Sequence, residues 1–128
     1  MKHSERYERG WKKLQEIDGE AGERVVESLK DIAPELAQYI IEYSFGDIYS
    51  RETLPLAEKE IAVVSALTAL GNARPQLKVH LHGALNTGNS ISEMTAASTA
   101  AFLIAWMDFF IERICRISCR YQRIECPW

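Results

Sequence analysis

The segment QLKVHLHGALNTG, residues 76–88, is the stretch on which both the fold and the candidate chemistry depend. Its apolar residues recur at helical spacing, Pro75 stands where a first-turn proline is tolerated, and Gly88 suits a left-handed cap. Most neighbours of His80 at three and four residues are apolar, so His80 lies on the inward face. We therefore expect a helix that carries one imidazole toward the core.

The same helical periodicity recurs on both sides of this segment, and no run of strict alternation is long enough to indicate a sheet. A capping box, Ser90 to Glu93, opens a last helical stretch that is either one long helix or two helices joined near residues 106–108. The sequence predicts an all-α, single-domain bundle of about six helices over residues 1–128. The other helices are expected at about 4–17, 20–32, 34–46, 55–70 and 75–88, with a loop at 47–51.

Charge and hydropathy restrict the class of partner. The formal net charge of −3 over 128 residues indicates neither a nucleic-acid partner nor an anionic membrane. The most apolar run, residues 100–111, is interrupted by Asp108 and is too short to span a bilayer. We expect it to be a buried core or interface helix. Because a chain of this length buries only a modest core, we also expect a homo-oligomer.

The cysteines indicate the redox compartment. An odd number, Cys115, Cys119 and Cys126, all near the C-terminal end, argues against a disulfide framework. No basic segment followed by an apolar one opens the chain, so no secretory signal is expected. A reducing cytoplasm is the simplest expectation. The last seventeen residues also hold four arginines and keep helical spacing, which is typical of a helix that docks on a partner subunit.

Two side chains on neighbouring helices suggest proton transfer. His80 titrates near physiological pH, and Glu60 borders the apolar stripe of the preceding helix, where a carboxylate needs a partner. A carboxylate beside the imidazole would fix its tautomer and raise its pKa. His82 lies ~200° around the helix from His80, so the pair cannot share a metal, and no metal site is expected.

Each of these residues also has a structural interpretation that the sequence leaves open. His80 is also compatible with a core histidine hydrogen-bonded to a neighbour. Glu60 would then be a surface residue paired with Lys59 or Arg51. Arg51, in the expected loop, is suited either to binding an anion or to a capping or inter-subunit ion pair.

Three motifs together resemble the carboxymuconolactone decarboxylase family: FGDIYSR at 45–51, LAEKE at 56–60 and the segment at 76–88. The resemblance covers about residues 6–106. It implies an alkylhydroperoxidase D-like fold, usually a trimer or hexamer, and cofactor-free decarboxylation of 4-carboxymuconolactone, a small carboxylate substrate. By position it implies that His80 is the proton donor and Glu60 its orienting acid. The residues that it suggests for substrate binding are Arg51, Tyr49, Gln76 and Trp106.

Alternatives within the same superfamily are a non-catalytic oligomeric binding protein and a peroxiredoxin-like antioxidant. The redox branch has a CxxC motif just before the histidine, whereas Ala73 and Gln76 occupy the equivalent positions here. Without a thiolate there the peroxide has no nucleophile, which leaves the tail cysteines as the only thiol candidates. The chain also has Ala105 and Met107 where the family usually has glycine and proline, and residues 107–128 diverge from it.

Overall fold

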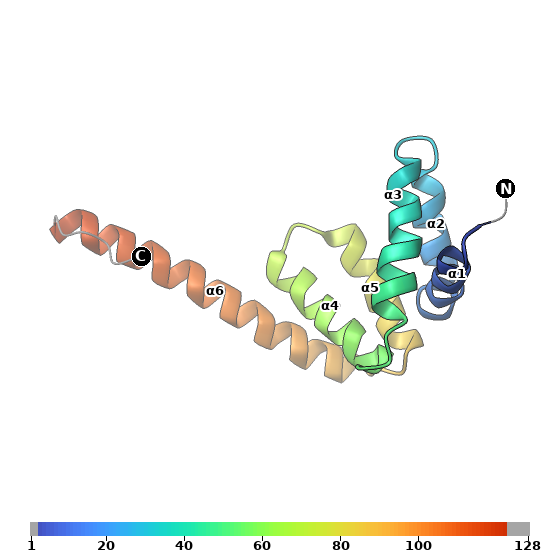
Figure 1. Cartoon of the computed structure of the whole chain (residues 1–128). Helices are drawn as coiled ribbons and strands as arrows, with labels where there is room; N and C mark the ends of the chain where they lie inside the picture. The colour runs from blue at the N-terminus through green and yellow to red at the C-terminus, as the bar shows by residue number, and fades with distance from the viewer. Residues whose placement is uncertain (1–2, 123–128) are drawn as a thin grey trace.

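Every regular element in the described part of the chain is helical. The computed structural model describes residues 3–122, with side chains up to Arg113. The prediction of an all-α fold with about six helices is confirmed, with the third helix changing from α to π geometry along its length (Figure 1). The elements are α1 (Glu5–Ile17), α2 (Gly19–Leu29), α3 (Pro34–Tyr39), the π-helix η1 (Ile40–Tyr49), α4 (Leu56–Leu70), α5 (Arg74–Asn86) and α6 (Ile91–Gln122).

Local sequence explains the start of α1, the start of α6 and the end of α4. The backbone N–H of Tyr7 donates to Ser4 Oγ at 3.1 Å, which caps α1. In the predicted capping box, Glu93 N–H donates to Ser90 Oγ at 3.2 Å, and Ser90 N–H donates to Glu93 Oε2 at 2.8 Å. Gly71, with φ of 69°, ends α4 in the left-handed region. The second helix is shorter than predicted, because residues 30–32 form turns.

The tightest packing in the fold is between α1 and η1, where two glycines let the backbones touch. A Cβ on Gly10 would lie 1.9 Å from the carbonyl oxygen of Ile41. A Cβ on Gly46 would lie 2.7 Å from a carbonyl oxygen of α1. Beside this contact Arg6 donates to both carboxylate oxygens of Asp47. The buried side chains that this packing encloses are Leu14, Ile17, Val26, Ala37, Ile41, Phe45 and Tyr49.

The predicted loop at residues 47–51 is wrong, because the helix continues past Gly46 and Asp47 in π geometry as far as Tyr49. In an α-helix, Ile40 and Tyr49 would lie on nearly opposite faces, since nine residues make ~2.5 turns. Hydrogen bonds from i to i+5 bring residues four or five apart onto one face. Ile40, Phe45 and Tyr49 consequently line one cavity together.

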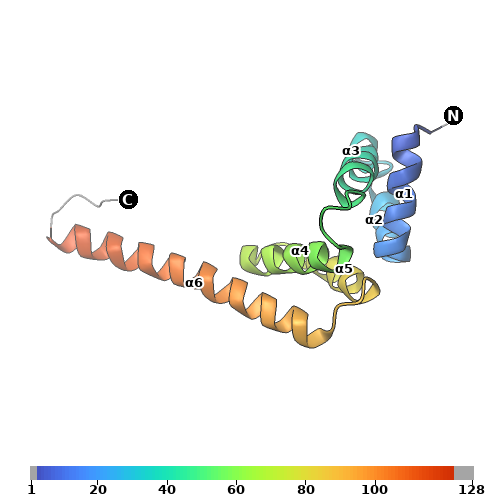
Figure 2. The same ribbon diagram turned by 60° about the horizontal axis from the view of Figure 1, so that its bottom comes forward.

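The last helix is continuous, which settles the choice between one helix and two. The first turns of α6 lie along α4: Met94 packs with Val64 and Ala84, and Thr68 Oγ1 donates to Ser98 Oγ at 3.4 Å. The later part of α6 projects away from the bundle (Figures 1 and 2). No glycine or proline breaks α6, which has 32 residues. Residues 102–111 are therefore not in a core: Phe102, Leu103, Ile104, Trp106, Met107, Phe109, Phe110 and Ile111 are 47–65% exposed.

The apolar run at residues 100–111 is too short to span a bilayer, but it lies within a longer apolar helix. Residues Ile91–Arg113 form a helix that is long and apolar enough to cross a membrane by length and composition, with a mean hydropathy of 1.5. Only 6% of the most apolar 18-residue stretch of this helix is buried within the described fold. A single helix of this kind is weak evidence for a span, because core helices of soluble proteins and signal sequences meet the same criterion.

Candidate active site

A buried carboxylate on α4 holds the imidazole on α5. Glu60 Oε2 lies 3.0 Å from His80 Nδ1, and Glu60 is 0% exposed, whereas the His80 side chain is 18% exposed. The alternative of a surface Glu60 paired with Lys59 is wrong. Lys59 Nζ instead donates to the carbonyl oxygens of Tyr49, at 2.9 Å, and Arg51. These two bonds tie the end of η1 to the start of α4.

The surroundings of His80 favour its charged form. Burial lowers the pKa of the imidazole, but the hydrogen bond and charge of Glu60, together with the charge of Asp18, raise that pKa by more. The net direction is upward from the ordinary value of histidine. The bond to Nδ1 leaves Nε2 as the ring nitrogen without a hydrogen bond among the described residues. An imidazolium held in this way can donate a proton from Nε2.

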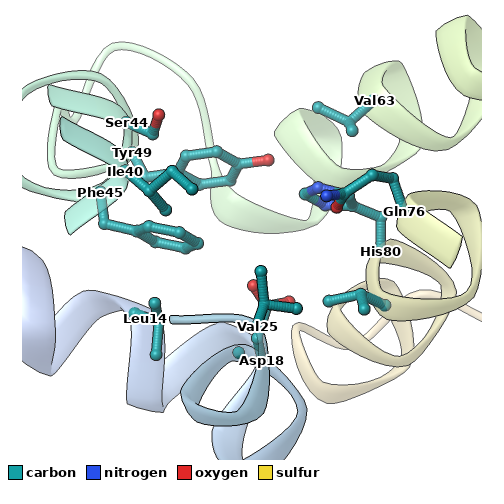
Figure 3. A pocket seen from close by; sticks show the side chains of 12 residues that line it. Leu14, Asp18, Val25, Ile40, Ser44, Phe45, Tyr49, Val63, Gln76 and His80 are labelled. Carbon is teal, nitrogen blue, oxygen red and sulfur yellow. The ribbon is translucent and has the colours of Figure 1, made fainter. Parts of the chain in front are cut away.

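The imidazole opens into a cavity of about 250 Å³ between α1, α2, η1, α4 and α5 (Figure 3). Most of the wall is apolar, and the polar groups converge from different helices. Such a combination is typical of a site for a small molecule that needs orientation. The lining residues are Leu14, Asp18, Gly22, Val25, Ile40, Ser44, Phe45, Tyr49, Val63, Gln76, Val79 and His80.

Tyr49 reaches this cavity from the last turn of η1. Its ring stacks on Phe45 with centroids 5.2 Å apart, and its hydroxyl points toward His80 (Figure 3). The hydroxyl is buried and forms no hydrogen bond in the described structure. Burial, followed by the charge of Glu60 and by the closeness of its carboxylate as a hydrogen-bond acceptor, raises the pKa of this phenol, so it stays protonated. Tyr49 thus offers a neutral donor to a ligand in the cavity.

Asp18 is the site residue that sequence reasoning missed. The sequence predicts a first helix that ends at about residue 17, and Asp18 is the C-cap of that helix. The side chain, however, is 5% exposed and lines the same cavity as His80. The available signal was its position four residues after Leu14, which continues the apolar stripe of α1. A polar residue at such a position is either satisfied internally or functional.

Gly83 leaves the space in which the two carboxylates approach each other. A Cβ at this position would lie 2.6 Å from Asp18 Oδ1 and 3.1 Å from Glu60 Oε2. Alanine normally stabilises a helix interior relative to glycine by ~1 kcal/mol. Gly83→Ala is instead expected to destabilise the protein by ~1–3 kcal/mol through overpacking against buried groups. Urea unfolding followed by circular dichroism measures the change, and an unchanged or higher midpoint would contradict this packing.

The structure gathers some of the predicted substrate-binding residues and separates others. Tyr49 and Gln76 line the cavity with His80. Arg51 is exposed and does not line the cavity. The helix η1 ends at Tyr49, two residues before Arg51, and the chain then runs along the surface. Trp106 packs against Phe110 in a tilted arrangement along the projecting part of α6, and it does not line the cavity within one chain. The unbroken helix carries Trp106 away.

His82 lies on a different side of α5 from His80, as its angular offset predicted. It lines a separate surface hollow with Lys78 and Arg24. Among the described residues, no three histidine, cysteine, aspartate or glutamate side chains are grouped so that they could hold a metal ion. The polar groups that reach the cavity are the His80 imidazole, the Asp18 carboxylate, the hydroxyls of Ser44 and Tyr49 and the amide of Gln76.

Comparison with known proteins identifies the family. The profile of the carboxymuconolactone decarboxylase family matches residues 34–109, more than half of the chain, and this segment carries Tyr49, Glu60, Gln76 and His80. The chain belongs to the carboxymuconolactone decarboxylase family. Asp18 lies before the matched segment. The family assignment agrees with the resemblance drawn from the three motifs.

Curated members of the family differ in length and name. The chain is 28% identical over 95 residues to 4-carboxymuconolactone decarboxylase of Acinetobacter baylyi, covering 73% of this chain and 70% of that protein. It is 30% identical over 88 residues to peroxisomal protein 2 of Schizosaccharomyces pombe, covering 68% of this chain. It is 30% identical over 82 residues to peroxisomal protein 2 of Saccharomyces cerevisiae, covering 64% of this chain. The chain spans only 41% and 29% of these two proteins.

Proposed function

We propose that this protein is a cofactor-free decarboxylase of a small carboxylated lactone, 4-carboxymuconolactone or a related acid, with His80 as the general acid. The observation that carries the proposal is the buried Glu60 carboxylate 3.0 Å from His80 Nδ1, at the wall of a cavity of small-molecule size. Similarity to a 4-carboxymuconolactone decarboxylase supports the choice of substrate class.

The reaction needs electron acceptance and one proton. The leaving carboxylate of such a lactone is attached to a saturated ring carbon next to a carbon–carbon double bond, and that double bond is conjugated with the lactone carbonyl. When the bond between the ring carbon and the carboxylate breaks, CO₂ leaves and the electron pair spreads into the carbonyl as a dienolate. Nε2 of the His80 imidazolium then delivers a proton to the carbon next to the carbonyl, giving the enol-lactone. Solvent restores the proton on His80.

Each part of the site has a role in this sequence. The Tyr49 hydroxyl, which has no hydrogen bond in the described structure, donates to oxygen as negative charge develops there. Glu60 holds the imidazole in one orientation and stabilises its charged form. Val25, Val63 and Val79 form an apolar wall, which favours neutral CO₂ over the carboxylate that it replaces.

A single assay tests the reaction class. Purified protein is incubated with 4-carboxymuconolactone in D₂O, and CO₂ release is measured together with deuterium in the product by NMR. We expect CO₂ in proportion to lactone consumed and one deuterium on the carbon next to the carbonyl. Consumption no faster than in buffer would rule out this substrate, and a non-catalytic binding role would then be the better interpretation.

We also propose that the protein acts as a homo-oligomer, either a trimer or a hexamer. The support is the row of exposed large apolar side chains on α6 between Phe102 and Ile111, which a water-exposed monomer would leave uncovered. A helix that is apolar around most of its circumference is normally buried by a partner. Association of α6 between copies would also give Trp106 a packed environment.

A further inference from the structure

We propose that Asp18 is a substrate-binding residue that acts in its protonated form, donating a hydrogen bond to the anionic substrate, so that the cavity admits a carboxylate only when Asp18 carries a proton. This inference rests on the proposed decarboxylation. It adds a residue outside the segment that defines the family, and a requirement on the charge of the site.

The first argument is the unmet hydrogen bonding of Asp18. Its side chain is 5% exposed, and Oδ1 has no hydrogen-bond partner in the described structure. A carboxylate oxygen out of water without a donor costs free energy unless the group is protonated or a ligand contacts it. Asp18 lines the cavity into which His80 opens. A ligand in that cavity can therefore contact Asp18 and the imidazole together.

The second argument is the charge of the cluster. Glu60 faces Asp18 from α4, His80 faces it from α5 and Tyr49 faces it from η1. From α2 it is Gly22 that lies beside Asp18, and glycine has no side chain to titrate. With both carboxylates ionised, the cluster keeps a net negative charge even when the imidazole is protonated. A proton on Asp18 makes the cluster neutral, which removes the repulsion that an entering carboxylate would meet.

The surroundings of Asp18 raise the pKa of its carboxyl group, so that it gains or loses its proton within the pH range of ordinary assays. Burial raises the pKa of Asp18, the charge of His80 lowers it, and the charge of Glu60 raises it, giving a pKa of about 6. Asp18 is therefore largely protonated below that pH and loses its proton as the pH rises through it. Substrate should bind tightly on the acid side, and its KM should rise toward ~10-fold per pH unit above pH 6.

Asp18→Asn tests the proposal, because the amide donates a hydrogen bond but cannot lose a proton. We expect the KM for 4-carboxymuconolactone to rise above pH 6 in the wild type and to stay flat between pH 5 and 8 in the variant. Asp18→Leu, which has no donor, should show a raised KM at every pH. Asp31→Asn, an exposed surface change, should behave as wild type.

A binding measurement separates this proposal from the proposed function. Succinate, a small dicarboxylate that cannot react, is titrated into wild type and Asp18→Asn at pH 5.5 and 7.5 by calorimetry. Binding that is lost at pH 7.5 only in the wild type supports the role of Asp18 even if no lactone is decarboxylated. The proposal is overturned if neither KM nor succinate binding shows a pH dependence that Asp18→Asn removes. The wild-type measurements stand even if the variants fold poorly.

Discussion

The kcat for decarboxylation is expected to fall ~10²–10⁴-fold in the variant His80→Gln, because a positioned general acid usually contributes that much to the rate. Glutamine has a similar reach and can still donate to Glu60, so the buried carboxylate keeps a partner. It cannot transfer a proton to the dienolate. The rate of CO₂ release under saturating substrate measures the effect, and circular dichroism checks that the helical content is unchanged.

His82→Gln is the matched control for this prediction. It makes the same chemical change two residues away, on an exposed part of the same helix that lines a different hollow. We expect wild-type kcat for this variant. If His80→Gln retained kcat within threefold of wild type while staying folded, His80 would be a structural histidine and the proton would come from another group.

Gly10→Ala is expected to give the largest loss of stability of any single methyl addition in the described fold. The added Cβ would lie 1.9 Å from the carbonyl oxygen of Ile41, which is backbone and cannot rotate away. The helices α1 and η1 must then separate, which also loosens the burial of Leu14 and Phe45. We expect a loss of ~3 kcal/mol or more, against the ~1 kcal/mol gain that alanine normally brings to a helix. Urea unfolding measures it.

Gly71→Ala is the control for Gly10→Ala. Gly71 has nothing within 4 Å of a Cβ, so only its left-handed backbone, with φ of 69°, opposes alanine. The cost of that conformation for a residue with a Cβ is ~1–2 kcal/mol. A larger loss for Gly71→Ala than for Gly10→Ala would mean that the close approach of α1 and η1 is not what stabilises the fold.

The success of the helix predictions has a local cause. Apolar spacing, the Ser90–Glu93 box and stop signals such as Gly71 depend on residues within a few positions of each other, so they can be recognised along the chain. The pairing of Glu60 with His80 could be predicted from the sequence for a related reason. Each lies next to an apolar helical stripe on consecutive helices, where a carboxylate and an imidazole have few other partners.

The errors have tertiary causes. Gly46-Asp47 carries the local signal of a helix end, but its glycine serves close packing against α1, and the helix continues in π geometry to bring Tyr49 to the cavity. The absence of a helix break after Trp106 was visible, but the direction in which an unbroken α6 leaves the bundle was not. Within one chain, neither Arg51 nor Trp106 lines the cavity, and their predicted part in substrate binding stays a prediction.

By itself, the sequence determined that the chain is helical, that it belongs with the carboxymuconolactone decarboxylases, and that His80 and Glu60 are its candidate pair. Those conclusions need only spacing along one helix or between two neighbouring ones. Only the tertiary structure decided that Asp18 joins the pair, because its burial depends on α1, α4 and α5 converging around Gly83. Asp18 ends a helix in the sequence, but it lines the cavity because segments far apart in the chain converge around it.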